Sequence, residues 1–174
     1  MKILMSLADR DFPPDIRVEK EARTLIQGGH ELFLLCPNYK DRASREVVGG
    51  ITIFRVNDPV GLRRVWNLGW FTFFLTDLFW QEQMEHIVER EGIEALHIHD
   101  LPMVKTGLSV ARRFGIPLIA DLHEIYTVAL RAWASKWTWK HEVVTMIRRW
   151  KSVEKTCVHQ ADWVLTIVDE ARQY

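Results

Sequence analysis

The sequence predicts an α/β protein with a Rossmann-like parallel sheet flanked by helices. Short apolar segments such as 3–5, 32–36 and 95–99 alternate with longer amphipathic stretches. Because strands joined by helical crossovers are parallel, this alternation predicts a parallel sheet. Segment 32–36 is apolar throughout, which is typical of a strand covered on both sides. With 174 residues, 48% of them hydrophobic, the chain fits one domain over 1–174.

The first half of the chain has clear signals for helix and strand ends. Asp15 is a good N-cap for a helix that runs to about Gln27 and stops at Gly28 and Gly29. The predicted core face of this helix consists of Ile16, Ala22, Leu25 and Ile26. After a polar loop over 38–45, the alternating strand 51–56 is expected nearer an edge of the sheet. One long aromatic-rich helix is expected over about 70–90.

The second half continues the same alternation. Strand 95–99 precedes a helix that opens at Pro102 and ends at Gly115. The remaining predicted elements are a strand over 117–120, a broken helical region over 126–159, a strand over 163–168 and the start of a helix after Asp169. Because Tyr174 falls about one turn into that helix, we expect the sequence to be a piece of a longer protein.

Composition and motifs exclude several classes of protein. Acidic and basic residues balance, 23 against 23, so global charge gives no reason to expect nucleic acid as a partner. Neither a dinucleotide-binding G-x-G-x-x-G nor a P-loop motif occurs. Cys36 and Cys157 match no metal spacing and are expected to be buried free thiols in a reducing cytoplasm. The N-terminus resembles a first strand rather than a signal peptide, and segment 66–80 is too short to span a bilayer.

Polar side chains follow two predicted strands. His99 and Asp100 end one, and Asp121, His123 and Glu124 end the next. Ligands of parallel sheets bind at the carboxyl ends of the strands, so we expect both clusters to face one crevice. The alternative for Asp121 and Glu124 is a helix-capping turn.

Two further interpretations concern metal and the first loop. A metal-dependent hydrolase would use His97, His99, Asp100 and His123, but no zinc-binding spacing supports it, and we predict no metal. The polar loop 9–15 leads into a helix N-terminus, which favours an anion or a hydroxyl. Its alternative role is to cap and solvate a turn.

Several segments resemble, in order and spacing, the N-terminal domain of GT-B glycosyltransferases, specifically retaining family-four (group 1) enzymes. The matching segments are 15–22 with Gly-His-Glu at 29–31, His-Ile-His-Asp-Leu-Pro at 97–102, Gly-Ile-Pro-Leu-Ile-Ala-Asp-Leu-His-Glu at 115–124, and 161–166. The resemblance implies two Rossmann-like domains across a cleft. The N-terminal one holds the acceptor, and the C-terminal one, absent here, holds a nucleotide-diphosphate sugar.

The resemblance also implies roles for individual residues and the kind of reaction. His123 is the expected catalytic residue near the donor sugar. The expected substrate-binding residues are Asp15, Arg17, His99, Asp100, Asp121 and Glu124. The reaction would retain the anomeric configuration and need no cofactor, with the nucleotide-diphosphate sugar as the donor substrate. Loop 9–14 departs from the Gly-Gly turn of many relatives, which leaves the usual phosphate contact of that turn in doubt.

By this interpretation the fragment alone should not turn over substrate. The runner-up is a non-catalytic sugar- or nucleotide-binding module that keeps the fold.

Tryptophan and basic residues gather in two stretches. Seven of the eight tryptophans lie within 66–80 and 133–150, and 131–155 carries seven basic and two acidic residues. This mixture suits a helix at a membrane interface, with a lipid-linked acceptor and an anionic membrane surface as partners. The alternative is that the tryptophans pack the core and the charges face water. The predicted location is the cytoplasm, with attachment to the inner face of the cell membrane as an alternative.

Overall fold

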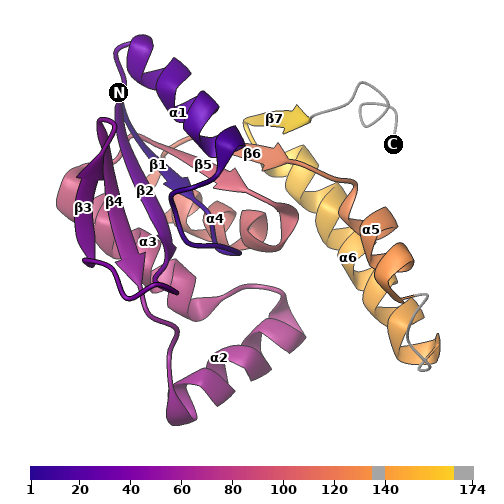
Figure 1. Cartoon of the computed structure of the whole chain (residues 1–174). Coiled ribbons are helices and arrows are strands. Elements are labelled where there is room, and N and C mark those ends of the chain that lie inside the picture. Colours follow the sequence, from indigo (N-terminus) through magenta and orange to yellow (C-terminus); the bar gives the residue numbers. More distant parts are fainter. Residues whose placement is uncertain (135–139, 167–174) are drawn as a thin grey trace.

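A computed structural model describes residues 1–134 and 140–166, with the side chains of 133–144 left out, and it contains a mostly parallel sheet (Figure 1). The strands in the described residues are β1 (Lys2–Ser6), β2 (Glu31–Pro37), β3 (Arg45–Val48), β4 (Ile51–Val56), β5 (Ala95–His99), β6 (Leu118–Leu122) and β7 (Trp163–Thr166). Their order is β3-β4-β2-β1-β5-β6-β7, and only β3 is antiparallel to its neighbour. The predicted α/β Rossmann-like class is confirmed.

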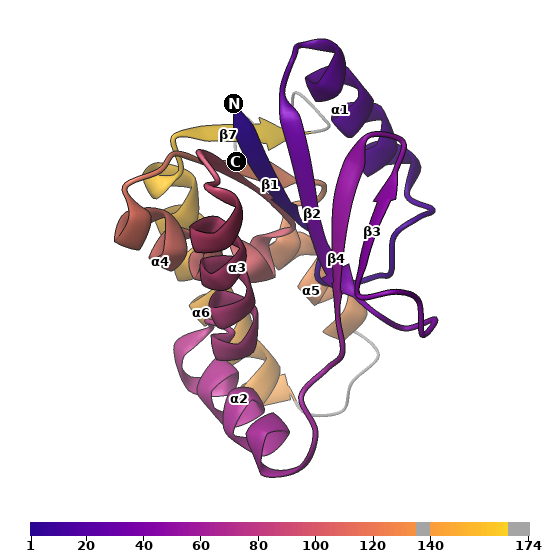
Figure 2. The same ribbon diagram turned by 90° about the vertical axis from the view of Figure 1, so that its left-hand side faces the viewer.

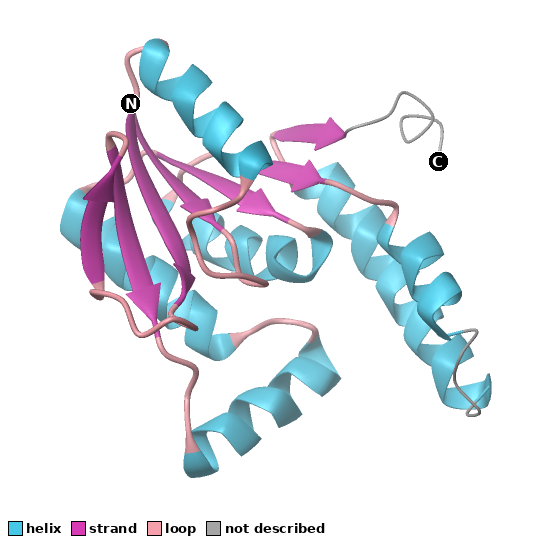
Figure 3. Ribbon diagram, in the orientation of Figure 1, coloured by secondary structure: helices cyan, strands magenta, loops and turns pink. Residues whose placement is uncertain are grey.

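The helices lie on both faces of the sheet, and Figure 3 shows how they frame it. They are α1 (Ile16–Gln27), α2 (Gly61–Phe74), α3 (Leu78–Glu91), α4 (Leu101–Phe114), α5 (Tyr126–Ala134) and α6 (Lys140–Gln160). Helix α1 covers one face, while α3 and α4 cover the opposite face (Figure 2). Helix α2 protrudes away from the sheet. Among the described residues, no helix is long and apolar enough to cross a membrane.

Side-chain alternation along the strands builds a separate core on each face. On the α1 side, Ile3 and Met5 of β1 pack with Val18 and Ala22 of α1. On the other side, Leu4 belongs to a larger core with residues of α3, α4 and α6. Since successive strand residues point to opposite faces, each buried strand contributes to both cores.

Strand β1 lies in the middle of the sheet, and the order in which the chain adds strands reverses there. The chain runs outward from β1 through β2 and β4 on one side and through β5, β6 and β7 on the other. The β1–β5 boundary is therefore the switch point at which open α/β sheets bind ligands, next to the carboxyl ends of their strands. Ser6 and His99 are the last residues of these two strands.

Three features of the first half differ from the predictions. The predicted loop 38–45 is present up to residue 44, but the unpredicted strand β3 follows it and pairs antiparallel with β4 across Gly49 and Gly50, whose positive φ values form a tight turn. The expected helix over 70–90 is two helices, because Leu75 adopts the left-handed conformation that ends α2. Ile16 does not join the core; its side chain is 70% exposed.

The remaining boundaries agree closely with the predictions. Strands 51–56 and 95–99 have the predicted ends, and Asp15 caps α1, its carboxylate accepting from the N–H groups of Arg17 and Val18. Strand β4 is next to the edge, with β3 outside it. Both cysteines are buried and free. The last two residues of the predicted strand 163–168, and the helix expected after Asp169, lie outside the described residues.

Candidate functional site

Histidines from β5 and an aspartate from β6 share the face of the sheet that α1 covers. His97 and His99 are two residues apart on β5, so they point to the same side, and their rings stack with centroids 4.7 Å apart. Asp121 is paired with His99 across the β5–β6 ladder. All three side chains are at least nine-tenths buried. Parallel register thus places polar groups where a buried strand would normally carry apolar ones.

Asp121 is the centre of this cluster. Its Oδ2 lies 2.7 Å from Nε2 of His123, in a hydrogen bond, and 2.9 Å from Nδ1 of His99. Burial opposes a charge on this carboxylate, but contacts with the three imidazoles outweigh it and hold the pKa of Asp121 well below its usual range. Asp121 is therefore an anion at neutral pH. Burial, in turn, lowers the pKa of His99.

His123 is held between two carboxylates. Its Nδ1 lies 3.3 Å from Oδ1 of Asp100, and its Nε2 bonds to Asp121. The neighbouring carboxylates of Asp100 and Asp121 raise the pKa of His123 to about 9 against the opposing effect of burial. The imidazolium is thus its main form at neutral pH. It suits donation of a hydrogen bond to a polar or anionic oxygen better than removal of a proton.

Asp100 holds an unusual backbone conformation at the start of α4. Its φ of 64° lies in the left-handed region, which non-glycine residues adopt rarely and which recurs at functional sites. As the N-cap of α4 it makes no side-chain capping hydrogen bond. Its N–H donates to the carbonyl oxygen of Asp121 instead, at 3.0 Å. The carboxylate is thereby directed toward His123 rather than toward the helix.

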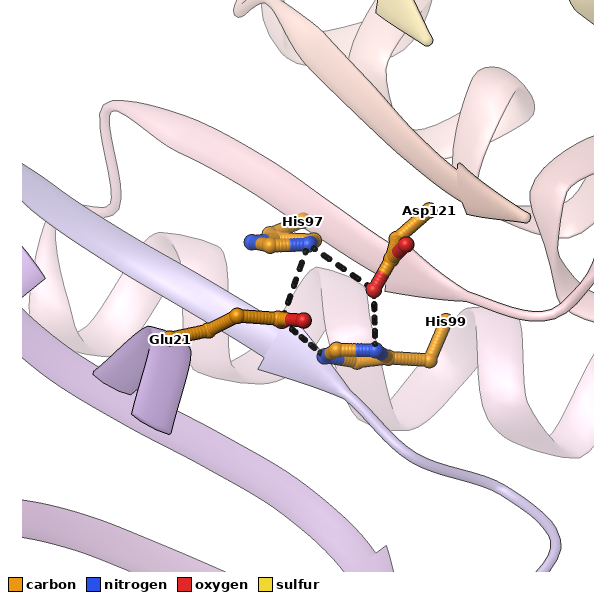
Figure 4. Close-up of side chains that lie close together, drawn as sticks. All are labelled: Glu21, His97, His99 and Asp121. Carbon is orange, nitrogen blue, oxygen red and sulfur yellow. Dashed lines mark ion pairs between the residues drawn. The ribbon is translucent and has the colours of Figure 1, made fainter. Parts of the chain in front are cut away.

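Sequence reasoning missed Glu21, which reaches the cluster from α1 (Figure 4). Its Oε2 lies 3.7 Å from Nε2 of His97 and 3.9 Å from Nε2 of His99. Burial raises the pKa of Glu21, and the charge of Asp121 adds to this. The available signal was its place on α1 beside the buried Ala22, since an acidic residue on a core-facing stripe is unusual. Glu21, His97, His99 and Asp121 can each offer one metal-ligand atom, all within 4.8 Å of one another.

The predicted substrate-binding pair Asp15 and Arg17 lies at the start of α1. Besides capping α1, the buried carboxylate of Asp15 forms ion pairs with Arg10 at 3.5 Å and with Arg17 at 3.4 Å. Within the described part of the chain, none of their ion pairs or hydrogen bonds reaches His99 or His123. The capping alternative for this loop is therefore present in the structure, and a role in substrate binding stays a prediction.

Glu124 stands at the outer rim of the cluster. It is exposed, and it borders a cavity of about 690 Å³ together with Leu122, residues of α6 and the end of β7. Burial raises the pKa of Glu124, as does the nearby charge of Asp100. The structure thus brings together His99, Asp100, Asp121 and His123, with Glu124 next to them and a recess beside it.

A buried arginine, also missed by sequence reasoning, fixes the first loop. Arg55 on β4 donates from Nη2 to the carbonyl oxygen of Phe12 at 2.9 Å and from Nη1 to that of Ala43 at 3.0 Å. Its Nε lies 3.4 Å from Oδ1 of the buried Asp11. Loop 9–14 is therefore attached to the sheet at a defined position beside the β1–β5 switch point.

Comparison with known proteins identifies the family. The model of Glycosyltransferase Family 4 matches residues 16–174. No curated protein matches the chain.

Solved structures with the same fold include glycosyltransferases of GT-B architecture. Sucrose-phosphate synthase from Thermosynechococcus elongatus gives a TM-score of 0.72 at 13% identity, covering 99% of this chain and 44% of that one. Trehalose-6-phosphate synthase from E. coli, bound with UDP-2-fluoro glucose, gives 0.57 at 10%, covering 99% and 41%. UGT89C1 from Arabidopsis thaliana, complexed with UDP, gives 0.52 at 10%, covering 95% and 41%. The chain thus spans less than half the length of these three proteins.

Proposed function

Because the chain belongs to glycosyltransferase family 4, we propose that it is the acceptor-side domain of an enzyme that transfers a sugar from a nucleotide-diphosphate donor to an acceptor hydroxyl with retention. The observation that carries this proposal is His123, charge-paired with Asp100 and Asp121 at the carboxyl end of β6. The bound UDP and UDP-sugar analogue of two structural relatives support a nucleotide sugar as the donor. No resident cofactor is needed.

The proposed chemistry suits a positively charged group that is held rigidly. Glycosyl transfer leaves negative charge on the departing diphosphate and an electron-poor sugar ring. An imidazolium whose Nε2 is held by Asp121 keeps Nδ1, which lies beside Asp100 without a hydrogen bond of good geometry, for donation to a sugar or acceptor oxygen. Asp100, Asp121 and the anchored loop 9–14 orient the acceptor and exclude water, which is catalysis by positioning.

The donor half of the reaction belongs, in this proposal, to a second domain. Basic groups that stabilise the diphosphate are expected there, because the described cluster is rich in carboxylates. We therefore expect the chain alone to be inactive and a longer protein that contains it to be active. If the longer protein were as inactive as the chain alone with every nucleotide sugar, that result would favour the alternative of a non-catalytic binding module.

The test uses the longer protein with a panel of nucleotide sugars, and measures release of the nucleoside diphosphate. His123→Ala is expected to reduce turnover by about 100-fold or more, in line with the loss of one preorganised donor. His86→Ala, at an exposed histidine of α3, is the control. NMR of the product reports its anomeric configuration. An inverted product, or full activity of His123→Ala, contradicts the proposal.

Helix α2 supports a second function, attachment to an anionic membrane surface that carries a lipid-linked acceptor. It buries none of its side chains. Its most exposed apolar residues are Leu62, Val65, Trp66, Leu68 and Phe73. Arg63 and Arg64 accompany them, and α2 has no acidic residue. Such a helix suits an interface between water and lipid.

Some tryptophans of the two stretches fit the core-packing interpretation, and one of them fits a membrane contact. Trp80 and Trp150 are buried, as core packing predicts, whereas Trp66 is 75% exposed. The side chains of Trp133, Trp137 and Trp139 lie outside the described residues. The membrane proposal therefore depends on α2.

Flotation with phosphatidylserine-containing vesicles tests the membrane proposal. Trp66→Ser with Phe73→Ser should weaken binding about tenfold or more, because burying each aromatic side chain contributes roughly 1.5–3 kcal/mol. Val47→Ser, at an exposed valine of β3, is the matched control. Binding should also fall as salt rises. Equal flotation of the double variant and the control would rule out α2 as the membrane contact.

A further inference from the structure

The polar cluster beneath His123 contains more ligand atoms than the proposed transfer reaction uses. Nε2 of His97, Nε2 of His99 and Oε2 of Glu21 are buried and have no hydrogen-bond partner of good geometry. Unpartnered buried polar atoms are rare, because each loses the hydrogen bond that water would otherwise provide, and this loss costs free energy. Three such atoms at one place indicate a group that the protein chain itself does not provide.

The spacing of these atoms fits a metal ion. Oε2 of Glu21 lies 3.7 Å from Nε2 of His97 and 3.9 Å from Nε2 of His99, and Nε2 of His97 lies 3.7 Å from Oδ2 of Asp121. Ligands about 2.1 Å from a tetrahedral zinc ion are about 3.4 Å apart, so these three separations exceed the required one by only a few tenths of an ångström, and all four ligand atoms lie within 4.8 Å of one another. Figure 4 shows the four side chains pointing toward one another.

We propose that Glu21, His97, His99 and Asp121 form a structural site for a divalent ion of the zinc class. Imidazole and carboxylate are ligands that Zn²⁺ accepts, and the two carboxylates would balance its charge. Four protein ligands leave no open position, so the ion does no chemistry on a substrate. It would instead tie α1 to β5 and β6.

The surroundings of the site support this assignment. Asp121 holds Nδ1 of His99 at 2.9 Å, and Nε2 of the same ring lies 3.9 Å from Oε2 of Glu21. The side chain of Glu21 is 31% exposed, which leaves a route for the ion to enter. The set differs from the sequence-based hydrolase alternative, which grouped His97 and His99 with Asp100 and His123. Asp100 and His123 lie outside the proposed ligand set.

Binding of Zn²⁺ itself is the test, and it does not depend on transferase activity. The untagged chain, stripped with chelator, is titrated with Zn²⁺ by calorimetry and with Co²⁺ by visible absorption, whose bands report tetrahedral coordination. We expect one ion per chain. Glu21→Gln and His97→Gln should each weaken binding by more than about tenfold, because losing even an outer-shell partner costs about 10–100-fold.

The control is His86→Gln, which removes an exposed histidine of α3 and should bind Zn²⁺ like the unaltered chain. Glu21→Gln keeps the shape of a partly exposed side chain, so it tests the site even where His97→Gln fails to fold by circular dichroism. The proposal is overturned where the unaltered chain binds no ion, or where Glu21→Gln binds as tightly as His86→Gln.

Discussion

The two faces of strand β5 have opposite chemistry. Leu96 and Ile98 point into the core beneath α3 and α4, where both are fully buried among apolar side chains. His97 and His99 alternate with them and are almost as deeply buried, yet they face Asp121 and ionisable groups from α1. One five-residue strand thus serves packing on one side and polar chemistry on the other.

This difference shows what each face contributes. The apolar face depends on volume and close packing, where even one added methyl group matters. The polar face depends on complete pairing, because a buried charge without its partner is costly. Burial alone therefore does not distinguish a structural residue from a functional one on this sheet. The chemical identity of the neighbours does.

The largest effect is expected on the polar face. Asp121→Asn keeps the size of the side chain but removes the carboxylate that pairs with His123 and His99. Breaking a buried pair from one side costs about 3–5 kcal/mol. Urea unfolding at pH 7 measures the loss. A change below about 1 kcal/mol would show that Asp121 does not hold the cluster together.

On the apolar face, Ile98→Ala should lower the free energy of unfolding by about 2–5 kcal/mol, because it leaves a cavity in a fully buried core. Its Zn²⁺ affinity should stay that of the unaltered chain if the faces are independent. Val47→Ala on the exposed edge should change stability by less than about 0.5 kcal/mol. If Ile98→Ala also lowered the free energy of unfolding by less than about 0.5 kcal/mol, that result would contradict close packing beneath α4.

Gly107 in α4 sharpens the packing argument. A Cβ there would lie 2.6 Å from Cγ1 of Ile98, so Gly107→Ala should destabilise the chain by about 1–3 kcal/mol. Gly69 in α2 is the control, because nothing lies within 4 Å of its Cβ position. Gly69→Ala should stabilise the chain by up to about 1 kcal/mol, as expected for an open helical site. Thermal unfolding of the two variants should therefore shift in opposite directions, and a shared sign would count against this packing.

The two thiols provide the smallest and most local comparison. Cys36, on β2, lies in the core beneath α1, and Cys157, on α6, lies in the core on the opposite face of the sheet; burial raises the pKa of each to about 11. At pH 8 both should react with a disulfide reagent far more slowly than in the unfolded chain. If the two thiols of the native protein react at different rates, the cores on the two faces of the sheet open independently of each other. Rapid reaction of either thiol without unfolding would contradict its burial.

Local signals were enough to predict much of the fold. The N-cap at Asp15, the apolar run of β2 and the glycines after α1 act over a few residues, so these elements could be predicted. Edge strand β3 was missed because its four residues have no pattern of their own and depend on pairing with β4. The break at Leu75 depends likewise on how α3 begins at Asp77.

The candidate site shows the same division. The convergence of His99, Asp121 and His123 was predictable, because parallel strands bring their carboxyl ends to one edge. Glu21 was not, because its approach depends on how α1 rotates over the sheet. The charge state of His123 also required three dimensions, since Asp100 and Asp121 must both lie within reach of one ring.

Arg55 contacts loop 9–14 through a carbonyl oxygen of the backbone, and every residue has such an oxygen. Asp11 pairs with Arg55 through its carboxylate and Phe12 is buried in the core, but the exposed side chains of Asp9, Arg10 and Pro14 can change without loss of this attachment. A loop beside the ligand-binding edge is thus free to vary its chemistry while it keeps its place. Under the proposed function, substitutions in this loop would alter the acceptor preference of related chains and leave the sheet untouched, as long as an arginine remains at the position of Arg55.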